Sequence, residues 1–220
     1  MAFLSEWNQR YNENTHLSVW PWSDLVSYVM RYAYSKKKEF RVLELGFGAG
    51  ANIPFFLSLG YNYYGIDGSA IIVNKLKKKF PHIKKNLIIG DFTNHIPFKE
   101  KFDLIVDRSA LTHNTTEEIR QCLELVYEKM KPDAKYIGID WFSTMHSDYL
   151  TATKVDNYTK RNYTNGQFAN VGNVHFSNKS HLLDLFKKFK MLVLEHKVIT
   201  TKIPQKKKFA AWNFIAKKLR

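Results

Sequence analysis

Residues 41–68 read RVLELGFGAGANIPFFLSLGYNYYGIDG, and this stretch decides the fold. It opens with an apolar run around Val42 and Leu43, turns through three glycines, and closes on Asp67 after a second apolar run. This order predicts a strand, a tight turn, a helix, a second strand and an acid. Glycine adopts the positive φ that such a turn needs, and the helix that follows presents unpaired amides to a ligand.

The turn through Gly46, Gly48 and Gly50 is compatible with two cofactors. It satisfies both G-x-G-x-x-A, a dinucleotide fingerprint, and E-x-G-x-G-x-G, a pattern of S-adenosylmethionine binders. Asp67 lies about 20 residues on, where such folds place a carboxylate on the ribose hydroxyls. Glu44 would repel a pyrophosphate but can hold the ammonium of a methionine tail. We therefore favour S-adenosylmethionine; the competing interpretations are a dinucleotide site and a glycine turn that only packs a helix on a strand.

Length and composition predict one domain over residues 1–220. The chain has 220 residues and 45% hydrophobic content, which suits one core rather than two. The single cysteine, Cys122, lies in a helical pattern, so neither a disulfide framework nor a thiolate metal site is expected. No signal-like segment is present, and no stretch reaches the roughly 18 apolar residues of a membrane span. We expect a cytoplasmic protein, monomeric or homodimeric, with no metal and no membrane partner.

The charge is strongly basic, because 34 Lys and Arg residues against 20 Asp and Glu leave a formal net charge of +14. Such a balance raises the question of nucleic acid or an anionic substrate. The lysine clusters at residues 36–38, 77–79, 187–190 and 217–220, however, fall at or just after the ends of predicted elements. Cations there complement the helix dipole and keep a surface soluble.

Strands and helices alternate through the first two thirds of the chain. Residues 1–40 form a lead with an extended Trp20-Pro21-Trp22 and a helix from Asp24 to about Tyr34, capped by Ser23. From Arg41 on, short loops join strands and helices. The later strands are predicted over 61–66, 86–89, 101–106 and 135–141, with helices over 69–80 and from Thr115 or Thr116 to Met130. This alternation predicts a parallel, doubly wound sheet whose ligands lie at the carboxyl ends of its strands.

The last third is organised differently. Residues 142–176 show no long period and are predicted to be a lid-like insertion over an acceptor. Ser177 is expected to cap a helix, followed by strands over 191–201 and 209–216. Only KIPQKKK separates these two strands, so they pair antiparallel. The predicted fold class is α/β, doubly wound, with a mostly parallel seven-stranded sheet, a C-terminal antiparallel strand pair and helices on both faces.

Four motifs together resemble the class I, Rossmann-like S-adenosylmethionine-dependent methyltransferases that act on small molecules. They are ELGFGAG at 44–50, GIDGS at 65–69, GDF at 90–92 and FDLIVDRSALTH at 102–113, in order and evenly spaced. The resemblance covers nearly the whole chain and implies S-adenosylmethionine as cofactor, S-adenosylhomocysteine as product and residues 41–141 as the cofactor-binding half.

The resemblance also implies residue roles. Asp67 would hold the ribose, and Asp91 with the Phe92 amide the adenine edge. Gly68 and Ser69 would flank the adenine, and Asp107 and Arg108 would border the sulfonium. Two of the acids have plainer alternatives, since Asp91 and Asp107 equally suit turns after strands. The full set implied to contact the cofactor is Glu44, Gly46, Gly48, Gly50, Asp67, Gly68, Ser69, Asp91, Phe92, Asp107, Arg108 and, from the lead, Tyr11.

Methyl transfer from a sulfonium is an in-line displacement, so positioning carries most of the catalysis. A base is needed only if the acceptor loses a proton. His113 and Arg108 are the catalytic candidates; His113 acts either as that base or as a residue that merely lines the pocket. Residues expected to face the acceptor are Trp20, His113, His146, Tyr149, Arg161 and His175, although loop aromatics also form small cores of their own.

The sequence argues against some classes of methyl acceptor and favours others. The turn after the fourth strand reads DRSA rather than D/N-P-P-Y/F, which argues against amino methylation of nucleic-acid bases, and mid-helix Cys122 argues against cytosine carbon-5 chemistry. A small metabolite is favoured, sugar-like as in bacterial surface glycans, or anionic and held by a clamp of Arg108, His113, Arg161 and His175. RNA ribose or ring-nitrogen methylation, a dinucleotide-dependent oxidoreductase or epimerase, and a noncatalytic cofactor binder remain the alternatives.

Overall fold

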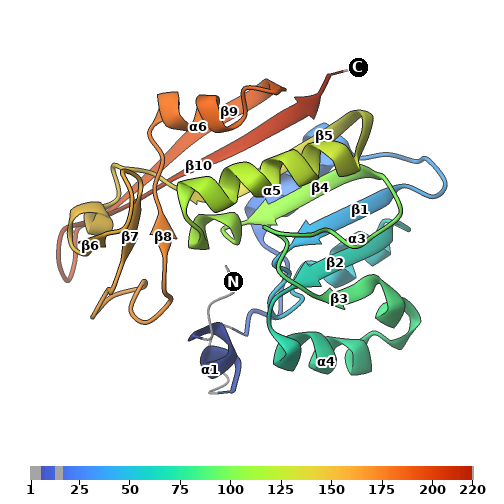
Figure 1. Ribbon diagram of the computed structural model, residues 1–220, viewed down its shortest axis with the longest axis horizontal. Coiled ribbons are helices and arrows are strands. Elements are labelled where there is room, and N and C mark those ends of the chain that lie inside the picture. Colours follow the sequence, from blue (N-terminus) through green and yellow to red (C-terminus); the bar gives the residue numbers. More distant parts are fainter. Residues whose placement is uncertain (1–5, 13–16, 220) are drawn as a thin grey trace.

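A computed structural model describes residues 6–12 and 17–219. Its centre is a seven-stranded sheet of order β3-β2-β1-β4-β5-β10-β9 (Figure 1). Of these seven strands, β10 alone runs opposite to the other six, which confirms the predicted mostly parallel sheet with a C-terminal antiparallel pair. The strands are β1 (Arg41–Leu45), β2 (Asn62–Asp67), β3 (Leu87–Ile89), β4 (Phe102–Arg108), β5 (Met130–Phe142), β9 (Phe189–Thr201) and β10 (Lys207–Lys218).

Helices cover both faces of this sheet. One apolar cluster joins it to α5 (Thr116–Lys129) and α6 (Lys179–Leu185) and includes the fully buried Cys122. A second cluster joins the opposite face to α3 (Ile53–Ser58), α4 (Ala70–Lys79) and α2 (Ser23–Tyr28), which continues as the π-helix η1 (Val29–Ala33). The short helices η2 (Pro81–Asn86) and η3 (Leu111–His113) follow α4 and β4. Among the described residues, no helix has the length and apolar character of a membrane span.

Local sequence signals account for most helix starts. Thr115 and Glu118 form a capping box at α5, and the Ser69 hydroxyl accepts a bond from the backbone N–H of Ile72 at α4. Two predicted caps are wrong. Ser23 is already helical, and the N-cap of α6 is Asn178 rather than Ser177. Ser177 instead donates its backbone N–H to the Phe142 carbonyl at 2.8 Å, so it belongs to a bridge leaving β5.

Register brings the ends of three strands together. Leu45 of β1 pairs with Ile66 of β2 and with Asp107 of β4. The chain winds outward from β1 to β3 on one side and then crosses back to β4 on the other, so this edge is the topological switch point of the sheet. Ligands of such folds bind at that point, beyond the carboxyl ends of the strands.

Residues 142–176 form a small cap with a sheet of its own. It contains η4 (Ser147–Leu150) and three short strands, β6 (Thr153–Lys154), β7 (Thr159–Arg161) and β8 (Val174–His175), in the order β6-β7-β8. Buried aromatic and aliphatic side chains fill it: Phe142, Tyr163, Phe168, Val171, Val174 and Phe176. Strands of two or three residues are too short for a detectable period, and helix α1 (Glu6–Asn12) went unpredicted for the same reason.

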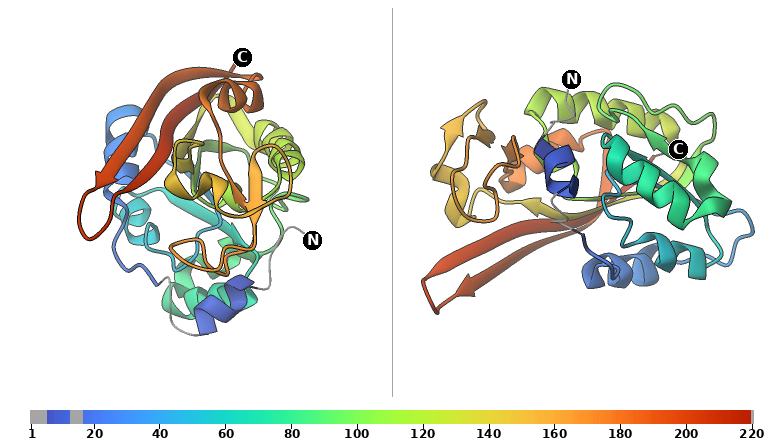
Figure 2. Two further views of the ribbon diagram at one scale, coloured as in Figure 1. Left: turned by 90° about the vertical axis from the view of Figure 1, so that its left-hand side faces the viewer. Right: turned by 90° about the horizontal axis from the view of Figure 1, so that it is seen from below.

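The β9–β10 hairpin extends beyond the rest of the sheet (Figure 2). Pairing between β10 and β5 begins only at Ala211 with Phe142, whereas β10 and β9 pair from Lys207 with Thr201 onward. The first residues of β10 and the turn before them therefore have no third strand beside them.

Candidate functional site

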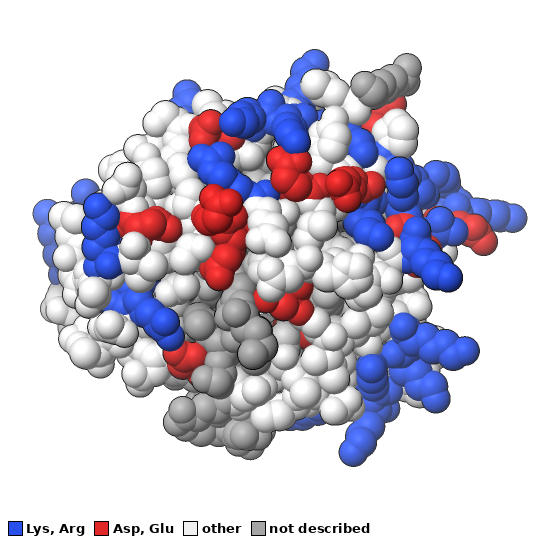
Figure 3. All heavy atoms as spheres, in the orientation of Figure 1, with Lys and Arg blue, Asp and Glu red and all other residues white. Residues whose placement is uncertain are grey.

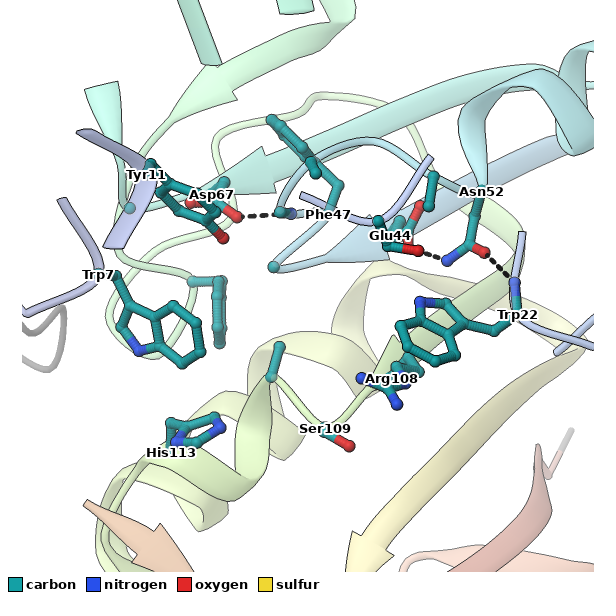
Figure 4. A pocket seen from close by; sticks show the side chains of 18 of the residues that line it. Trp7, Tyr11, Trp22, Glu44, Phe47, Asn52, Asp67, Arg108, Ser109 and His113 are labelled. Carbon is teal, nitrogen blue, oxygen red and sulfur yellow. Dashed lines mark hydrogen bonds between the residues drawn. The ribbon is translucent and has the colours of Figure 1, made fainter. Parts of the chain in front are cut away.

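A cavity of about 340 Å³ opens at the switch point, within the size range of small-molecule and cofactor sites (Figure 4). Strand ends, the glycine turn, the lead and η3 all contribute to its wall. Of the residues singled out from the sequence, the wall includes Tyr11, Glu44, Gly46, Gly48, Asp67, Gly68, Asp91, Phe92, Arg108 and His113.

The glycine turn is shaped for close backbone approach. Gly46 and Gly48 have φ of 61° and 52°, in the left-handed region that glycine tolerates best. A Cβ on Gly46 would lie 2.3 Å from the Cβ of Ala110, so no side chain fits there. The Gly48 amide donates to the Asp67 carboxylate at 2.9 Å, which ties the turn to the end of β2.

Asp67 and Tyr11 define one end of the cavity. The Asp67 carboxylate is 6% exposed and also accepts the Ser69 amide at 2.9 Å. Burial raises the pKa of Asp67 to about 6, although these two amides oppose the shift. Burial, with the nearby Asp67 charge, raises the pKa of the Tyr11 hydroxyl well above its usual range, so Tyr11 stays a neutral donor. This end offers a carboxylate acceptor and an aromatic surface.

Glu44 and Asn52 lie at the other end with Trp22 (Figure 4). The Glu44 carboxylate accepts bonds from Asn52 at 2.7 Å and from the Tyr63 hydroxyl at 2.6 Å. Asn52 in turn accepts the Trp22 backbone amide at 3.2 Å, which fixes the lead against β1. Burial raises the pKa of Glu44 to about 7 despite both hydrogen bonds.

The raised pKa of Glu44 predicts a pH-dependent stability. Between its ordinary value of 4.5 and about 7, the unfolded chain is ionised at this position while the folded chain retains the proton. The folded protein binds more protons, so the free energy of unfolding falls as pH rises through this window. We expect Glu44→Gln to remove a fall of about 1 kcal/mol between pH 6 and 7, measured by urea unfolding.

The comparison with wild type isolates this group, since the buried histidines contribute equally to both proteins. Glu124→Gln, at an exposed site on α5, is the matched control and should leave the slope unchanged. If the free energy of unfolding changed with pH equally in wild type and Glu44→Gln, the raised pKa of Glu44 would be contradicted.

Arg108 brings a positive charge to the same end. Its guanidinium carbon lies 3.5 Å from the centre of the Trp22 ring, and a guanidinium nitrogen lies 3.1 Å from the Asp140 carboxylate. Asp140 also pairs with Lys197 at 2.5 Å, and Lys197 pairs with Asp24 at 2.6 Å. This network holds the guanidinium plane in place, so the end of the cavity carries a carboxylate and an oriented cation.

His113 and Trp7 line the cavity side by side. The His113 Nδ1 lies 2.9 Å from the Asn173 carbonyl oxygen, which can only accept, so Nδ1 carries a proton. In the neutral ring the lone pair therefore belongs to Nε2. The Trp7 ring meets the imidazole edge-on at 5.0 Å. His113 thus presents an imidazole oriented by a backbone carbonyl beside an aromatic ring.

Asp91 lies in the cavity wall and also caps a turn. It lines the cavity together with Phe92, and its carboxylate also accepts the Thr93 amide at 3.0 Å and the Asn94 side-chain amide at 2.6 Å. The turn after β3 is thus capped by a residue that also faces the cavity.

Three residues implied to touch the cofactor lie behind the wall instead. Gly50 faces α4, where an added Cβ would lie 2.7 Å from Leu76, and Ser69 is fully buried as the cap of that helix. Asp107 is also fully buried and accepts the backbone amides of Ala110 and Leu111 at 2.8 and 3.1 Å. All three shape the loops that carry the wall.

The six residues expected to face the acceptor do not lie together. Only His113 lines the cavity; Trp20, His146, Tyr149, Arg161 and His175 are not among the described residues of its wall. Trp20 is 80% exposed, and His175 is fully buried within the cap.

The cap residues are engaged with one another. His146 packs against Phe168, and Tyr149 packs against Phe176, as members or neighbours of the cap's own core. Arg161 pairs with Glu6 at 3.1 Å and so ties the cap to α1. These aromatic side chains therefore form a small core within the cap, which was the alternative to facing the acceptor.

The sequence did not single out several wall residues. They are Trp7, Trp22, Asn52, Ser109, Ala110 and Asn114. The cluster of aromatics in the lead was a signal for Trp7 and Trp22, but it did not say which rings turn inward. Asn52 comes two residues after Gly50, but no sequence pattern singles it out. It links Glu44 to Trp22 through tertiary contacts, because it donates to the Glu44 carboxylate and accepts the Trp22 backbone amide.

Residues 42–133 match the protein family described as "Methyltransferase domain". Over 105 residues the chain is 32% identical to an uncharacterized methyltransferase of Oceanobacillus iheyensis, covering 47% of this chain and 48% of that protein. The chain thus matches about half the length of this curated relative.

Solved structures share the fold over most of the chain. A protein from Methanosarcina mazei, described as a SAM-dependent methyltransferase, aligns with a TM-score of 0.68 and 18% identity over 86% of this chain and 97% of that one. The N-methyltransferase NodS from Bradyrhizobium japonicum, solved with S-adenosylhomocysteine, aligns with a TM-score of 0.61 and 12% identity over 90% and 87%. At these identities the likeness shows the fold.

Proposed function

We infer that this chain, whose residues 42–133 match the methyltransferase domain family, is an S-adenosylmethionine-dependent methyltransferase that acts on a small molecule. The observation that carries this is the division of one cavity into two ends. One end has the Asp67 carboxylate beside the glycine turn, which suits a ribose. The other has Glu44 and Arg108, which suit the ammonium and carboxylate of an amino acid.

The residues of the cavity fit S-adenosylmethionine better than a dinucleotide. A dinucleotide would bring a pyrophosphate to the turn, where Glu44 stands 3% exposed in the wall. An ammonium beside Glu44 would favour the ionised carboxylate and pair with it, whereas the charges of a pyrophosphate would oppose its ionisation. Asp91 and the Phe92 amide remain the groups for the adenine edge, and Gly68 for its face.

The cofactor, when bound, supplies a methyl group on a sulfonium. The chain's own contribution is to hold the acceptor in line and to exclude water, for which Trp7, Tyr11 and Trp22 close the cavity from the lead. His113 can take a proton from the acceptor at Nε2, because Nδ1 is committed to the Asn173 carbonyl.

The acceptor atom is a hydroxyl oxygen of a small neutral molecule, of which a sugar is one example. An anionic acceptor was the other expectation, but Arg161 and His175 of the suggested clamp are outside the wall. Arg108 is assigned to the carboxylate of the cofactor, and the wall contributes the acids Glu44, Asp67 and Asp91. A hydroxyl acceptor must lose its proton, so it needs a base such as His113. A phosphate or carboxylate acceptor is already deprotonated and needs no base.

The function is tested by calorimetry and product analysis. We expect S-adenosylhomocysteine to bind the purified protein while NAD⁺ gives no heat. Incubation with S-adenosylmethionine and a panel of sugars and other hydroxyl compounds should then release S-adenosylhomocysteine. Binding of NAD⁺ in preference to S-adenosylhomocysteine would overturn the assignment.

The assignment of His113 as base predicts a change in pH profile. His113→Asn keeps a donor for the Asn173 carbonyl but removes the proton acceptor, so kcat should fall about 10²- to 10⁴-fold. The acidic limb of the pH–rate profile should disappear with it. His82→Asn, on the exposed helix η2, is the control. A raised KM for the acceptor with an unchanged pH profile would instead assign His113 to binding.

A further inference from the structure

The tip of the β9–β10 hairpin is highly exposed and carries an apolar side chain among lysines. Ile203, at the turn, is 86% exposed, and Ile199 on β9 is 53% exposed. Leu150 at the end of η4 is 80% exposed, and η4 is joined to the hairpin by a bond from the Lys208 amide to the Ser147 hydroxyl at 2.7 Å. We call this region, comprising Leu150, Ile199 and residues 202–208, the hairpin end. Large side chains exposed together in this way mark an interaction surface.

The charge of the hairpin end is of one sign. Lys202, Lys206, Lys207 and Lys208 are all exposed and form no ion pair with any described residue. From His196 to the C-terminus the sequence contains no Asp or Glu. The complementary partner is therefore anionic.

The shape of the hairpin end indicates which kind of anionic partner it fits. Figure 2 shows the hairpin as a projecting arm rather than as the wall of a groove, and Figure 1 places β6 of the cap at the same end of the molecule. In Figure 3, Lys and Arg side chains project at this end and at the opposite end of the face shown. An exposed isoleucine on a convex tip, flanked by lysines, matches a surface that is anionic outside and apolar beneath.

A nucleic acid is the other common anionic partner, and it fits less well. Single-stranded nucleic acid is bound largely by stacking bases on exposed aromatic rings. Residues 197–208 contain no aromatic side chain. Phe209, which follows, is half-buried against His146 and lies under Lys197. The hairpin end thus offers cations and aliphatic side chains without a stacking platform.

We propose that the hairpin end docks the protein on an anionic lipid membrane surface, with Ile203 inserted at the boundary of headgroups and acyl chains and the lysines on the headgroups. Apolar insertion and attraction to anionic lipid together give this mode of peripheral binding. It requires no membrane-spanning segment. The β10–β5 pairing that begins at Ala211 anchors the arm to the sheet.

The test is co-sedimentation of the full chain with phosphatidylglycerol–phosphatidylcholine vesicles, pure phosphatidylcholine vesicles serving as the neutral comparison. We expect binding to the anionic vesicles only, weakened by high salt. Ile203→Asp and, separately, the triple variant K206E/K207E/K208E should each lower the affinity at least about tenfold.

Matched controls make the same changes elsewhere. Leu183→Asp replaces an exposed apolar residue on α6, and K77E/K78E/K79E reverses a lysine run in the last turn of α4. Both should bind within about twofold of wild type, and circular dichroism melting should show that every variant folds. Absence of binding to anionic vesicles, binding indifferent to Ile203→Asp, or preferential salt-sensitive binding of tRNA through the same lysines would each overturn the proposal.

Discussion

Asp67→Asn should lower the affinity for S-adenosylhomocysteine about a hundredfold or more, measured by calorimetry at pH 7.5. The ribose hydroxyls would donate to this carboxylate, and each hydrogen bond to a charged acceptor contributes about 1.5–3 kcal/mol. The amide keeps the volume of the side chain but offers only one acceptor atom. That atom is then contested by the Gly48 and Ser69 amides, which Asp67 accepts at 2.9 Å each.

The loss should not reflect unfolding. Burial raises the pKa of Asp67 to about 6, so at pH 7.5 the folded ligand-free protein holds an ionised carboxylate at a cost that the neutral amide does not carry. The thermal unfolding midpoint of the ligand-free variant should therefore remain close to that of wild type. Asp184→Asn, an exposed acid on α6, controls for the loss of one negative charge. Unchanged S-adenosylhomocysteine affinity in Asp67→Asn would remove Asp67 from the nucleoside site.

Arg108→Met should separate the two ends of the cavity. We expect affinity for S-adenosylhomocysteine to fall about 10- to 100-fold, because the carboxylate of its amino acid loses a charge-assisted partner. Affinity for 5′-methylthioadenosine, which has the nucleoside but no amino acid, should change less than about twofold. Arg108→Lys should restore little, because a lysine cannot reproduce the planar stack on Trp22 at 3.5 Å.

The comparison of the two ligands distinguishes recognition from a structural effect. Arg120→Met breaks an exposed ion pair of the same kind with Asp184 and should leave both ligands unaffected. An equal loss for both ligands in Arg108→Met would mean that the substitution disturbs the fold through Asp140 and Lys197. Unchanged affinity for S-adenosylhomocysteine with a raised KM for the acceptor would place Arg108 on the acceptor instead.

The cofactor edge of the site was predictable because it is built from strand ends. Gly46, Asp67 and Arg108 each end or follow a predicted parallel strand, and parallel pairing puts such ends at one edge whatever the side chains do. The glycine turn was equally local, since positive φ at Gly46 and Gly48 depends on residue type. The sequence by itself therefore determined the sheet and the edge at which these strand ends meet.

The part of the cavity wall that the lead contributes was decided only by tertiary packing. The sequence Trp20-Pro21-Trp22 does not predict which of the two rings faces the cavity. Trp22 faces it because its backbone amide bonds to Asn52 and its ring stacks on Arg108. Residues 142–176 have no period that assigns side chains to a face, and the cap turns its histidines and aromatics into its own core rather than toward the cavity. Backbone periodicity specifies which ends meet, whereas the direction of a loop side chain depends on neighbours that are distant in sequence.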